Sequence, residues 1–196
     1  MKSLLIATRN LGKVREFREI LGSDWQVLSA SDLPHLPEVI EDGATFEENS
    51  VKKARECSAH FAGLVLADDS GLEVDALAGA PGVYSARFAG EPADDPKNNQ
   101  LLLQKMEPVE EDRRGAQFVC VLSLARDSEL LVSFQGKVRG RITRQPSGKA
   151  GFGYDPLFVP EGYQESFAEL GGEIKHRISH RARAMEQMIS YLKTNA

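Results

Sequence analysis

The amino-acid sequence predicts an α/β fold with a mixed sheet or a second lobe, in one domain over residues 1–196. Short apolar runs alternate with amphipathic helical patterns as far as residue 67, which is typical of strands connected by helices. Two β-rich runs, at residues 116–125 and 130–138, predict an antiparallel hairpin. A hydrophobic fraction of 41% over 196 residues suffices for one large domain or two small lobes.

Charge and composition exclude several classes of protein. The net charge is −5 without a basic block, which argues against a nucleic-acid groove. No run approaches the roughly 18 apolar residues of a membrane span, and the first apolar run is too short for a signal peptide. Cys57 and Cys120 fall in apolar patterns and show no disulfide or metal spacing. We expect a cytoplasmic protein that binds neither nucleic acid nor membrane.

The first strand and helix are predicted at residues 3–8 and 13–21, with a turn at residues 9–12. A strand, a turn and a helix start together favour phosphate binding, because free N–H groups and the positive end of the helix dipole face the ligand. Lys13 would add an ammonium group, although the spacing is not that of a Walker A loop. The pattern is more often that of an ordinary strand-to-helix turn with a solvated lysine.

A second strand is predicted at residues 25–29 and a second helix at residues 45–61. Asn49 and Lys53 are four residues apart, so they share one face of that helix. Taken alone, the two are typical of a solvent-exposed face, and Glu41 is typical of a loop carboxylate.

The central stretch is an apolar run at residues 64–67 followed by Asp68, Asp69, Ser70 and Gly71. We expect the strand to end at the two carboxylates, where ligands collect in open α/β sheets. Adjacent residues leaving a strand point to opposite sides, which predicts different roles for Asp68 and Asp69. Asp-Asp-Ser-Gly is also ordinary turn chemistry.

A third helix is predicted to begin at Asp94 or Asp95, with Pro96 near its first position. The hairpin follows it, and residues 141–143 continue the second strand. The hairpin interrupts the α/β pattern, which favours a mixed sheet or a second lobe.

A glycine-rich loop occupies residues 147–156. Its glycines permit close approach of the backbone to a ligand, and Phe152 and Tyr154 offer faces on which a base would stack. Asp155 would accept hydrogen bonds from ring N–H groups. The alternative is a flexible loop with two packing aromatic residues. A short strand is expected at residues 157–159.

The last helix is predicted at residues 179–193. Cations at a helix start oppose the helix dipole, so an anionic ligand would explain the basic residues at its entry. Those residues are Lys175, His176, Arg177, His180 and Arg181. His180 alone is more typical of a structural or surface histidine.

Six pieces along nearly the whole chain, in this order, resemble the inosine/xanthosine triphosphate pyrophosphatases of the Ham1 type. The pieces are Thr8-Arg-Asn-Leu-Gly-Lys13 with Glu16, Thr45-Phe46 with Asn49 and Lys53, Ala67-Asp-Asp-Ser-Gly71, Gly79-Ala-Pro-Gly82 with Tyr84-Ser-Ala-Arg87, Gly151-Phe-Gly-Tyr-Asp-Pro156, and Ser179-His-Arg181. Each piece is weakly specific alone, and their agreement in order makes the resemblance strong.

The resemblance implies a two-lobed α/β fold with an elongated mixed central sheet flanked by helices, an active site in the cleft between the lobes, and a homodimer. It also implies Mg²⁺-dependent hydrolysis of non-standard purine nucleoside triphosphates (ITP, dITP and XTP) to the monophosphate and pyrophosphate. Such an activity would cleanse the nucleotide pool and prevent misincorporation.

Residue roles follow from the resemblance by matching position. Asp69 would be the catalytic base and a metal ligand, with Glu41 as a second metal ligand. The substrate would be bound by Thr8, Arg9, Asn10, Leu11, Gly12, Lys13, Lys53, Ser70, Phe152, Gly153, Tyr154, Asp155, Lys175, His180 and Arg181. This chain departs from the pattern at Arg9, where a small or neutral polar residue is usual, and at Glu41-Asp42, which align only loosely.

Two other classes of function fit parts of the pattern. A Maf-like pyrophosphatase would act on other modified nucleotides, but the Phe152-Gly-Tyr-Asp155 loop favours stacking on a purine. A non-enzymatic nucleotide-binding module would bind ITP without releasing pyrophosphate, and the presence of both Asp68 and Asp69 counts against it.

Overall fold

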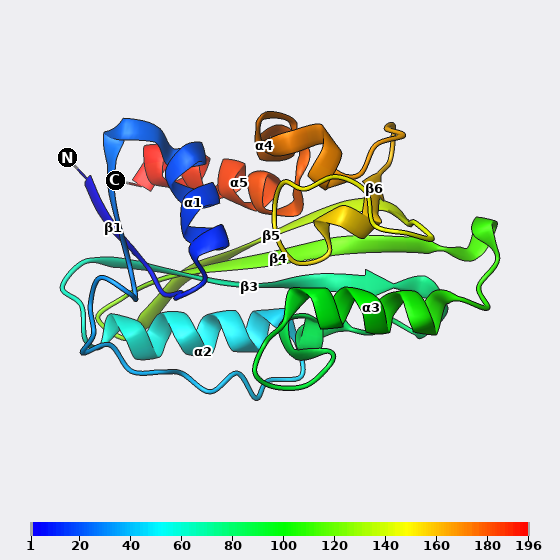
Figure 1. Ribbon diagram of the computed structural model, residues 1–196. Helices are drawn as coiled ribbons and strands as arrows, with labels where there is room; N and C mark the ends of the chain where they lie inside the picture. The colour runs from blue at the N-terminus through cyan, green and yellow to red at the C-terminus, as the bar shows by residue number, and fades with distance from the viewer. Residues whose placement is uncertain (1, 196) are drawn as a thin grey trace. The chain divides into compact units, whose positions relative to one another are not determined.

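The structure is a computed structural model that describes residues 2–195 (Figure 1). The sheet has the strand order β2-β1-β3-β4-β5-β6. The chain forms two compact units. The first comprises the chain as far as Asp69, Cys120–Gly136, and the chain from Arg181 onward. The second comprises Ser70–Val119 and Lys137–His180.

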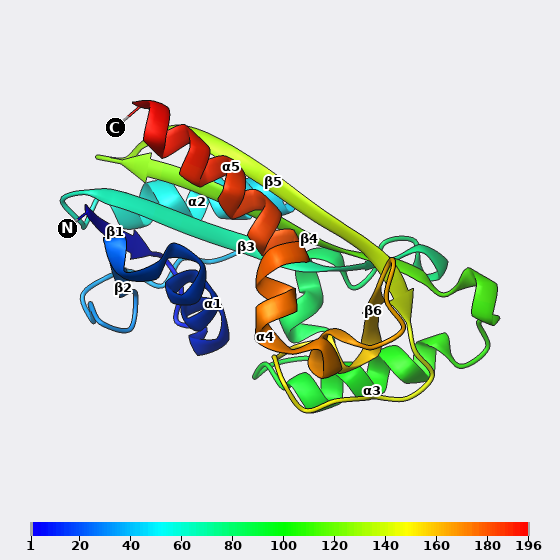
Figure 2. The same ribbon diagram turned by 90° about the horizontal axis from the view of Figure 1, so that it is seen from above.

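The first unit is a three-layer α/β arrangement. It contains β1 (Lys2–Ile6), α1 (Leu11–Leu21), β2 (Trp25–Ser29), α2 (Phe46–Ser58), the first part of β3 (Leu64–Val74) and nearly all of α5 (His180–Asn195). Strand β1 pairs in parallel with both β2 and β3. Helices α1 and α5 lie on one face of these strands and α2 lies on the other (Figures 1 and 2).

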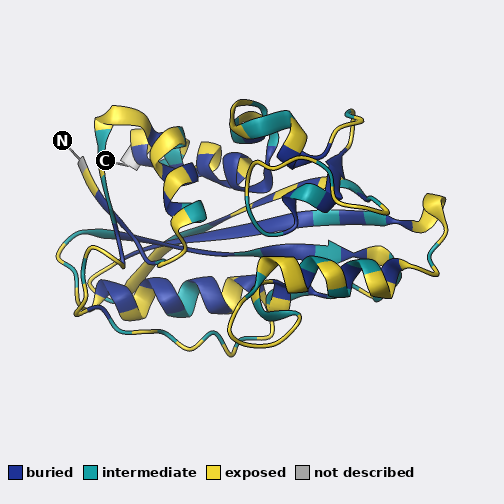
Figure 3. Ribbon diagram, viewed as in Figure 1, coloured by how far each residue is buried: buried dark blue, intermediate teal, exposed yellow. Residues whose placement is uncertain are grey.

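Strand alternation divides the core of the first unit between the two faces. Leu4 packs with Phe17 of α1 and Met185 of α5. Its neighbour Leu5 packs on the opposite face with Ala54 of α2. Figure 3 shows β3 buried along most of its length, as two covered faces require.

The second unit is built on the remainder of β3, parts of β4 (Gly115–Arg126) and β5 (Glu129–Ile142), and the short strand β6 (Phe158–Pro160). Its helices are α3 (Asp95–Met106) and α4 (Phe167–Ile178). Strand β6 pairs antiparallel with β5. The core combines aliphatic and aromatic side chains, and the ring centroids of Phe118 and Phe158 lie 4.7 Å apart.

The expected α/β class and the hairpin are confirmed. Strands β4 and β5 are joined by Asp127 and Ser128, both with positive φ (51° and 66°), as a tight hairpin turn requires. Helix α2 begins at Phe46, because the Thr45 side chain caps it by accepting from the N–H of Glu48, and it ends at Ser58 rather than at residue 61. Helix α1 begins at Leu11, two residues early, because the Asn10 side chain caps it.

The expected end of the central strand at Asp68 is wrong. Strand β3 continues through Asp68, Asp69, Ser70 and Gly71 to Val74. The turn propensity of these residues is overridden because tertiary partners satisfy both carboxylates within the strand.

Helix α4 is absent from the sequence-based prediction. Gly171 and Gly172 hide the helical pattern, and Gly171 breaks the helix with φ of 75°. A signal was nevertheless present: Ser166 and Glu169 form a reciprocal capping box at the start of α4.

Over residues 2–195, the structure contains no helix with the length and apolar character needed to cross a membrane.

Candidate active site

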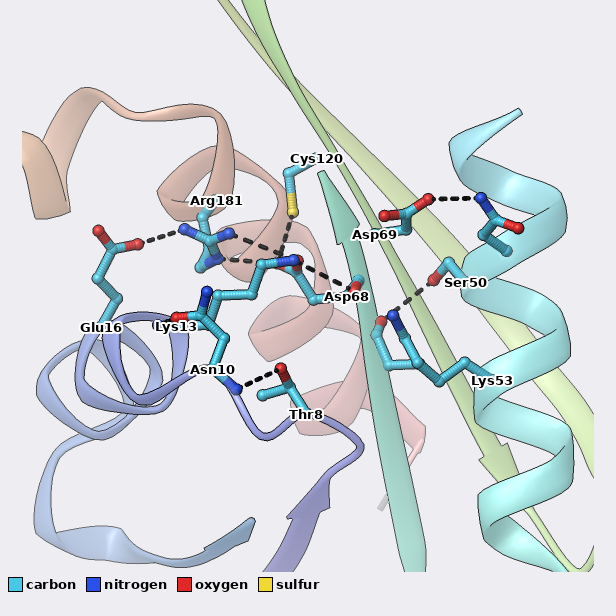
Figure 4. A network of polar contacts seen from close by, with 12 residues as sticks. Thr8, Asn10, Lys13, Glu16, Ser50, Lys53, Asp68, Asp69, Cys120 and Arg181 are labelled. Carbon is cyan, nitrogen blue, oxygen red and sulfur yellow. Dashed lines mark hydrogen bonds and ion pairs between the residues drawn. The ribbon is translucent and has the colours of Figure 1, made fainter. Parts of the chain in front are cut away.

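Asp68 and Asp69 are adjacent in β3 and point to opposite faces, as predicted. Asp68 faces α1 and α5, whereas Asp69 faces α2 (Figure 4). Both carboxylates are buried. The first unit therefore holds two distinct acidic environments separated by the thickness of a single strand.

On the first face, Asp68 is the centre of a buried ionic network. Arg181 Nε donates to Asp68 Oδ2 at 2.8 Å, and Lys13 Nζ pairs with Asp68 Oδ1. Arg181 also pairs with Glu16, and Cys120 Sγ lies 3.3 Å from Asp68 Oδ2. Burial alone would raise the pKa of the Asp68 carboxyl, but Arg181 and Lys13 hold that pKa well below its usual range. Asp68 is thus a fixed anion that gathers two cations.

On the second face, Asp69 meets residues of α2 and of the segment before it. Asn49 Nδ2 donates to Asp69 Oδ2 at 3.0 Å, and Lys53 pairs with Glu41. Asn49 and Lys53 are both buried, so a solvent-exposed face is excluded for them. Burial raises the pKa of Asp69; Lys13 and Lys53 oppose that rise, and the charge of Glu41 adds to it. Because the net effect disfavours the ionised Asp69 carboxylate, an additional cation beside it would be favourable.

The predicted phosphate residues surround the start of α1. Asn10 Oδ1 accepts from the N–H of Lys13 at 3.0 Å, and Thr8 Oγ1 accepts from the N–H of Asn10 at 3.2 Å. Arg9 donates to the carbonyl of Leu36, and Leu11 is largely exposed. Gly12 lies in the first turn of the helix. The cap fixes the strand-to-helix turn that carries Lys13 toward β3.

The predicted base-binding residues gather in the second unit. Lys175 Nζ pairs with Asp155 Oδ2 at 2.5 Å, and both side chains are at most 4% exposed. The same Asp155 oxygen accepts from the N–H of Phe152, and Lys175 lies 4.6 Å from the centre of the Phe152 ring. Tyr154 is buried, and its hydroxyl donates to the carbonyl of Ser85. The glycine-rich segment is therefore anchored rather than loose.

The basic residues near α5 divide between two helices. Lys175, His176 and Arg177 lie in the last turn of α4, where cations favour the helix dipole, so the dipole argument for an anion was wrong for these three. The argument still applies to His180 and Arg181, at the start of α5. The His180 ring stacks on Phe118, with centroids 4.7 Å apart and planes 11° apart.

The structure brings the predicted residues together in two groups. The first unit contains Thr8, Arg9, Asn10, Leu11, Gly12, Lys13, Glu41, Lys53, Asp69 and Arg181. The second contains Ser70, Phe152, Gly153, Tyr154, Asp155, Lys175 and His180. Sequence reasoning assigned no partner to Asp68 and did not anticipate that Asn49 contacts Asp69. The four-residue spacing of Asn49 and Lys53 placed them on one face of α2, which was the one indication in the sequence that they act together.

Asp69 and Glu41 carry carboxylate oxygens, the kind of hard ligand that a divalent cation such as Mg²⁺ takes. Among residues 2–195, no cluster of three or more His, Cys, Asp and Glu side chains suits a metal ion. Mg²⁺ often takes one or two protein carboxylates and keeps several waters, so a pair of carboxylates fits this ion. Burial and the charge of Glu41 disfavour the ionised form of Asp69, and a bound cation would stabilise that ionised form.

We expect neither cysteine to react in the native protein. Burial raises the pKa of the Cys57 thiol, and burial together with Asp68 raises that of Cys120 well above its usual range. Because the thiolate is the nucleophile, both thiols should resist DTNB at pH 8 and react only after denaturation in guanidinium. Rapid release of one equivalent of thionitrobenzoate from native protein would contradict this.

Known proteins resemble this chain in both sequence and structure. The profile of the Ham1 family matches residues 4–191. A dITP/XTP pyrophosphatase of Desulforamulus reducens is 50% identical over 191 residues, covering 96% of this chain and 94% of its own. One from Exiguobacterium sibiricum is 49% identical over 192 residues, covering 97% of both chains. The structure of the Staphylococcus aureus Ham1 protein superposes with a TM-score of 0.86 at 41% identity, over the full length of both chains.

Proposed function

This chain belongs to the Ham1 family, and from that premise we propose that it hydrolyses non-standard purine nucleoside triphosphates, dITP, XTP and ITP, to the monophosphate and pyrophosphate. It is a nucleotide pyrophosphatase, a hydrolase of the phosphoanhydride bond. The observation that carries the proposal is a buried Asp69 whose pKa responds to the charges of Lys13, Lys53 and Glu41, while Lys53 and Glu41 pair with each other in the same unit. The names of the relatives favour this activity over a Maf-like one.

The reaction is attack of water at the α-phosphorus, with pyrophosphate leaving. A triphosphate repels nucleophiles, so its charge must first be neutralised, and Lys13 and Lys53 are the cations that we assign to this task. Asp69 and Glu41 would hold Mg²⁺, which supplies further charge neutralisation and acidifies bound water. Asp69 would orient the attacking water and accept its proton.

Selection of the base is assigned to the second unit. Lys175 is a buried donor held by Asp155, and Phe152 lies against its ammonium group. Donors aimed at a 6-oxo group would lose their partner against a 6-amino purine. A site built in this way can discriminate by about 10⁴-fold or more. His180 and Tyr154 would complete the walls of this pocket.

We predict that kcat/KM for ITP, dITP and XTP exceeds that for ATP and GTP by about 10²-fold or more. The measurement is pyrophosphate release across the five nucleotides, with and without Mg²⁺. Omission of Mg²⁺ in the presence of EDTA should abolish release from every substrate. Equal rates across the purines would indicate a general nucleotide pyrophosphatase, and binding without release would indicate a non-enzymatic module.

We also propose that the protein works in the cytoplasm as a homodimer. Both statements, and the expected active site between two lobes, remain predictions from the family resemblance. Light scattering at micromolar protein concentration tests the dimer: a mass near twice 21.5 kDa is expected.

A further inference from the structure

Asn49 ties three elements of the first unit together through one side chain. Its Nδ2 donates to Asp69 Oδ2 at 3.0 Å, and its Oδ1 accepts from the N–H of Gly43 at 2.7 Å. The side chain is only 1% exposed. It therefore links α2, the strand residue Asp69, and the segment that carries Glu41.

The direction of the Asn49 amide follows from chemistry. A backbone N–H only donates, so the group facing Gly43 must be the amide oxygen. The NH₂ group must then face Asp69, where a carboxylate accepts it. Asn49 is consequently matched to both partners, and no other orientation of this amide satisfies both contacts.

Gly43 shows how closely the segment approaches α2. A Cβ placed on Gly43 would lie 2.7 Å from Asn49 Oδ1 and 2.8 Å from Glu48 Cβ. Both distances are shorter than real contacts of such atoms, so the close approach depends on glycine. The hydrogen bond between Gly43 and Asn49 therefore depends on the residue type at both positions: glycine permits the close approach, and asparagine supplies the acceptor.

Lys53 lies one helical turn beyond Asn49 and pairs with Glu41. The two α2 residues therefore act on the two candidate metal ligands: Asn49 on Asp69, and Lys53 on Glu41. Asn49 additionally holds the backbone two residues after Glu41.

We propose that Asn49 is a positioning residue for the reaction, which fixes the Asp69 carboxylate and the segment bearing Glu41 in the arrangement that receives the metal-bound triphosphate. The inference rests on the proposed function. Asn49 acts through Asp69 and need not touch substrate, so its loss should lower kcat more than it raises KM.

The neighbouring Ser50 provides a matched control. Ser50 is also buried on α2 and donates to β3, but to the backbone carbonyl of Ala67 at 3.1 Å. Ser50→Ala removes a contact between α2 and β3 without touching Asp69 or the segment before the helix. If Asn49 serves only to dock α2, variants at the two positions should behave alike.

Two substitutions of Asn49 separate its hydrogen bonds. Asn49→Ala removes both. Asn49→Asp keeps an acceptor for the Gly43 N–H but replaces the donor to Asp69 with a carboxylate oxygen. We expect both variants to lose about 30-fold or more in kcat on dITP with KM changed less than about threefold, whereas Ser50→Ala stays within about threefold of the wild type in both.

A second measurement does not require turnover. Mg²⁺ alone should raise the thermal unfolding midpoint of the wild type and of Ser50→Ala at similar concentrations. For Asn49→Ala, about tenfold more Mg²⁺ should be needed for half of that rise. Circular dichroism at 20 °C checks that each variant is folded, and if Asn49→Ala is not, Asn49→Asp decides the kinetic test.

The outcomes distinguish this inference from the proposed function. Wild type that releases no pyrophosphate from dITP, XTP or ITP would refute the proposed function. Active wild type with Asn49→Asp equal to Ser50→Ala in kcat would overturn the positioning role alone. A large rise in KM at unchanged kcat would also overturn it, because that result marks a substrate-binding residue.

Discussion

Asp69→Asn should lower kcat on dITP by about 10³-fold or more while nucleotide binding survives. Asparagine has nearly the same shape and can still accept a hydrogen bond from Asn49, so the local geometry should persist. What is lost is the negative charge that would hold the cation and the basic oxygen that would accept a proton from water. The measurements are single-turnover pyrophosphate release and calorimetric titration with ITP.

Asp94→Asn is a suitable control for that variant. Asp94 caps α3 by accepting from the N–H of Lys97, and asparagine caps helices about as well as aspartate. Its kcat should match the wild type. If Asp69→Asn retained kcat within tenfold of the wild type, Asp69 would not be the catalytic base.

Asp68→Asn should destabilise the protein by about 3–5 kcal/mol. The change removes the anion shared by Lys13 and Arg181 and leaves Glu16 as the carboxylate partner of the buried Arg181, with Lys13 only partly exposed. Because Asp68 is fully buried, water cannot replace the missing charge. Urea unfolding followed by the fluorescence of Trp25, the one tryptophan in the chain, reports on the unit that contains this network.

The comparison variant is Asp75→Asn. Asp75 also pairs with an arginine, Arg139, through two bonds of 2.6 and 3.1 Å, but both side chains are about half exposed. Exposed pairs contribute at most about 1 kcal/mol, so this variant should be nearly as stable as the wild type. If both variants lost the same free energy of unfolding, the buried network around Asp68 would contribute no more to stability than an exposed ion pair.

Strand alternation predicted that Asp68 and Asp69 face opposite sides of the sheet, and the structure confirms it. The same alternation separates Leu4 from Leu5 in β1. This prediction succeeded because side-chain direction in a strand depends only on local backbone geometry. The positions of Lys13 and Lys53 on their helices followed from similar local rules.

Partners could not be predicted in the same way. Glu16 belongs by pattern to the polar side of α1, yet it is buried because Arg181, 165 residues away, pairs with it. Asn49 is buried for a comparable reason. Such contacts depend on the packing of distant elements, whereas propensity describes the isolated segment. The same limitation explains why Asp-Asp-Ser-Gly was expected to end a strand that in fact continues.

The alternation along β3 also constrains how this protein can change in length. Deleting one residue from Leu64–Ala67 would move each later side chain of the strand to the opposite face of the sheet. Asp68 would then face α2, and Asp69 would face α1 and α5. A two-residue deletion would restore parity but shift both carboxylates along the sheet by about 6.6 Å. In a library of variants, conservative apolar replacements should therefore survive at these four positions, while insertions and deletions of any size should be purged.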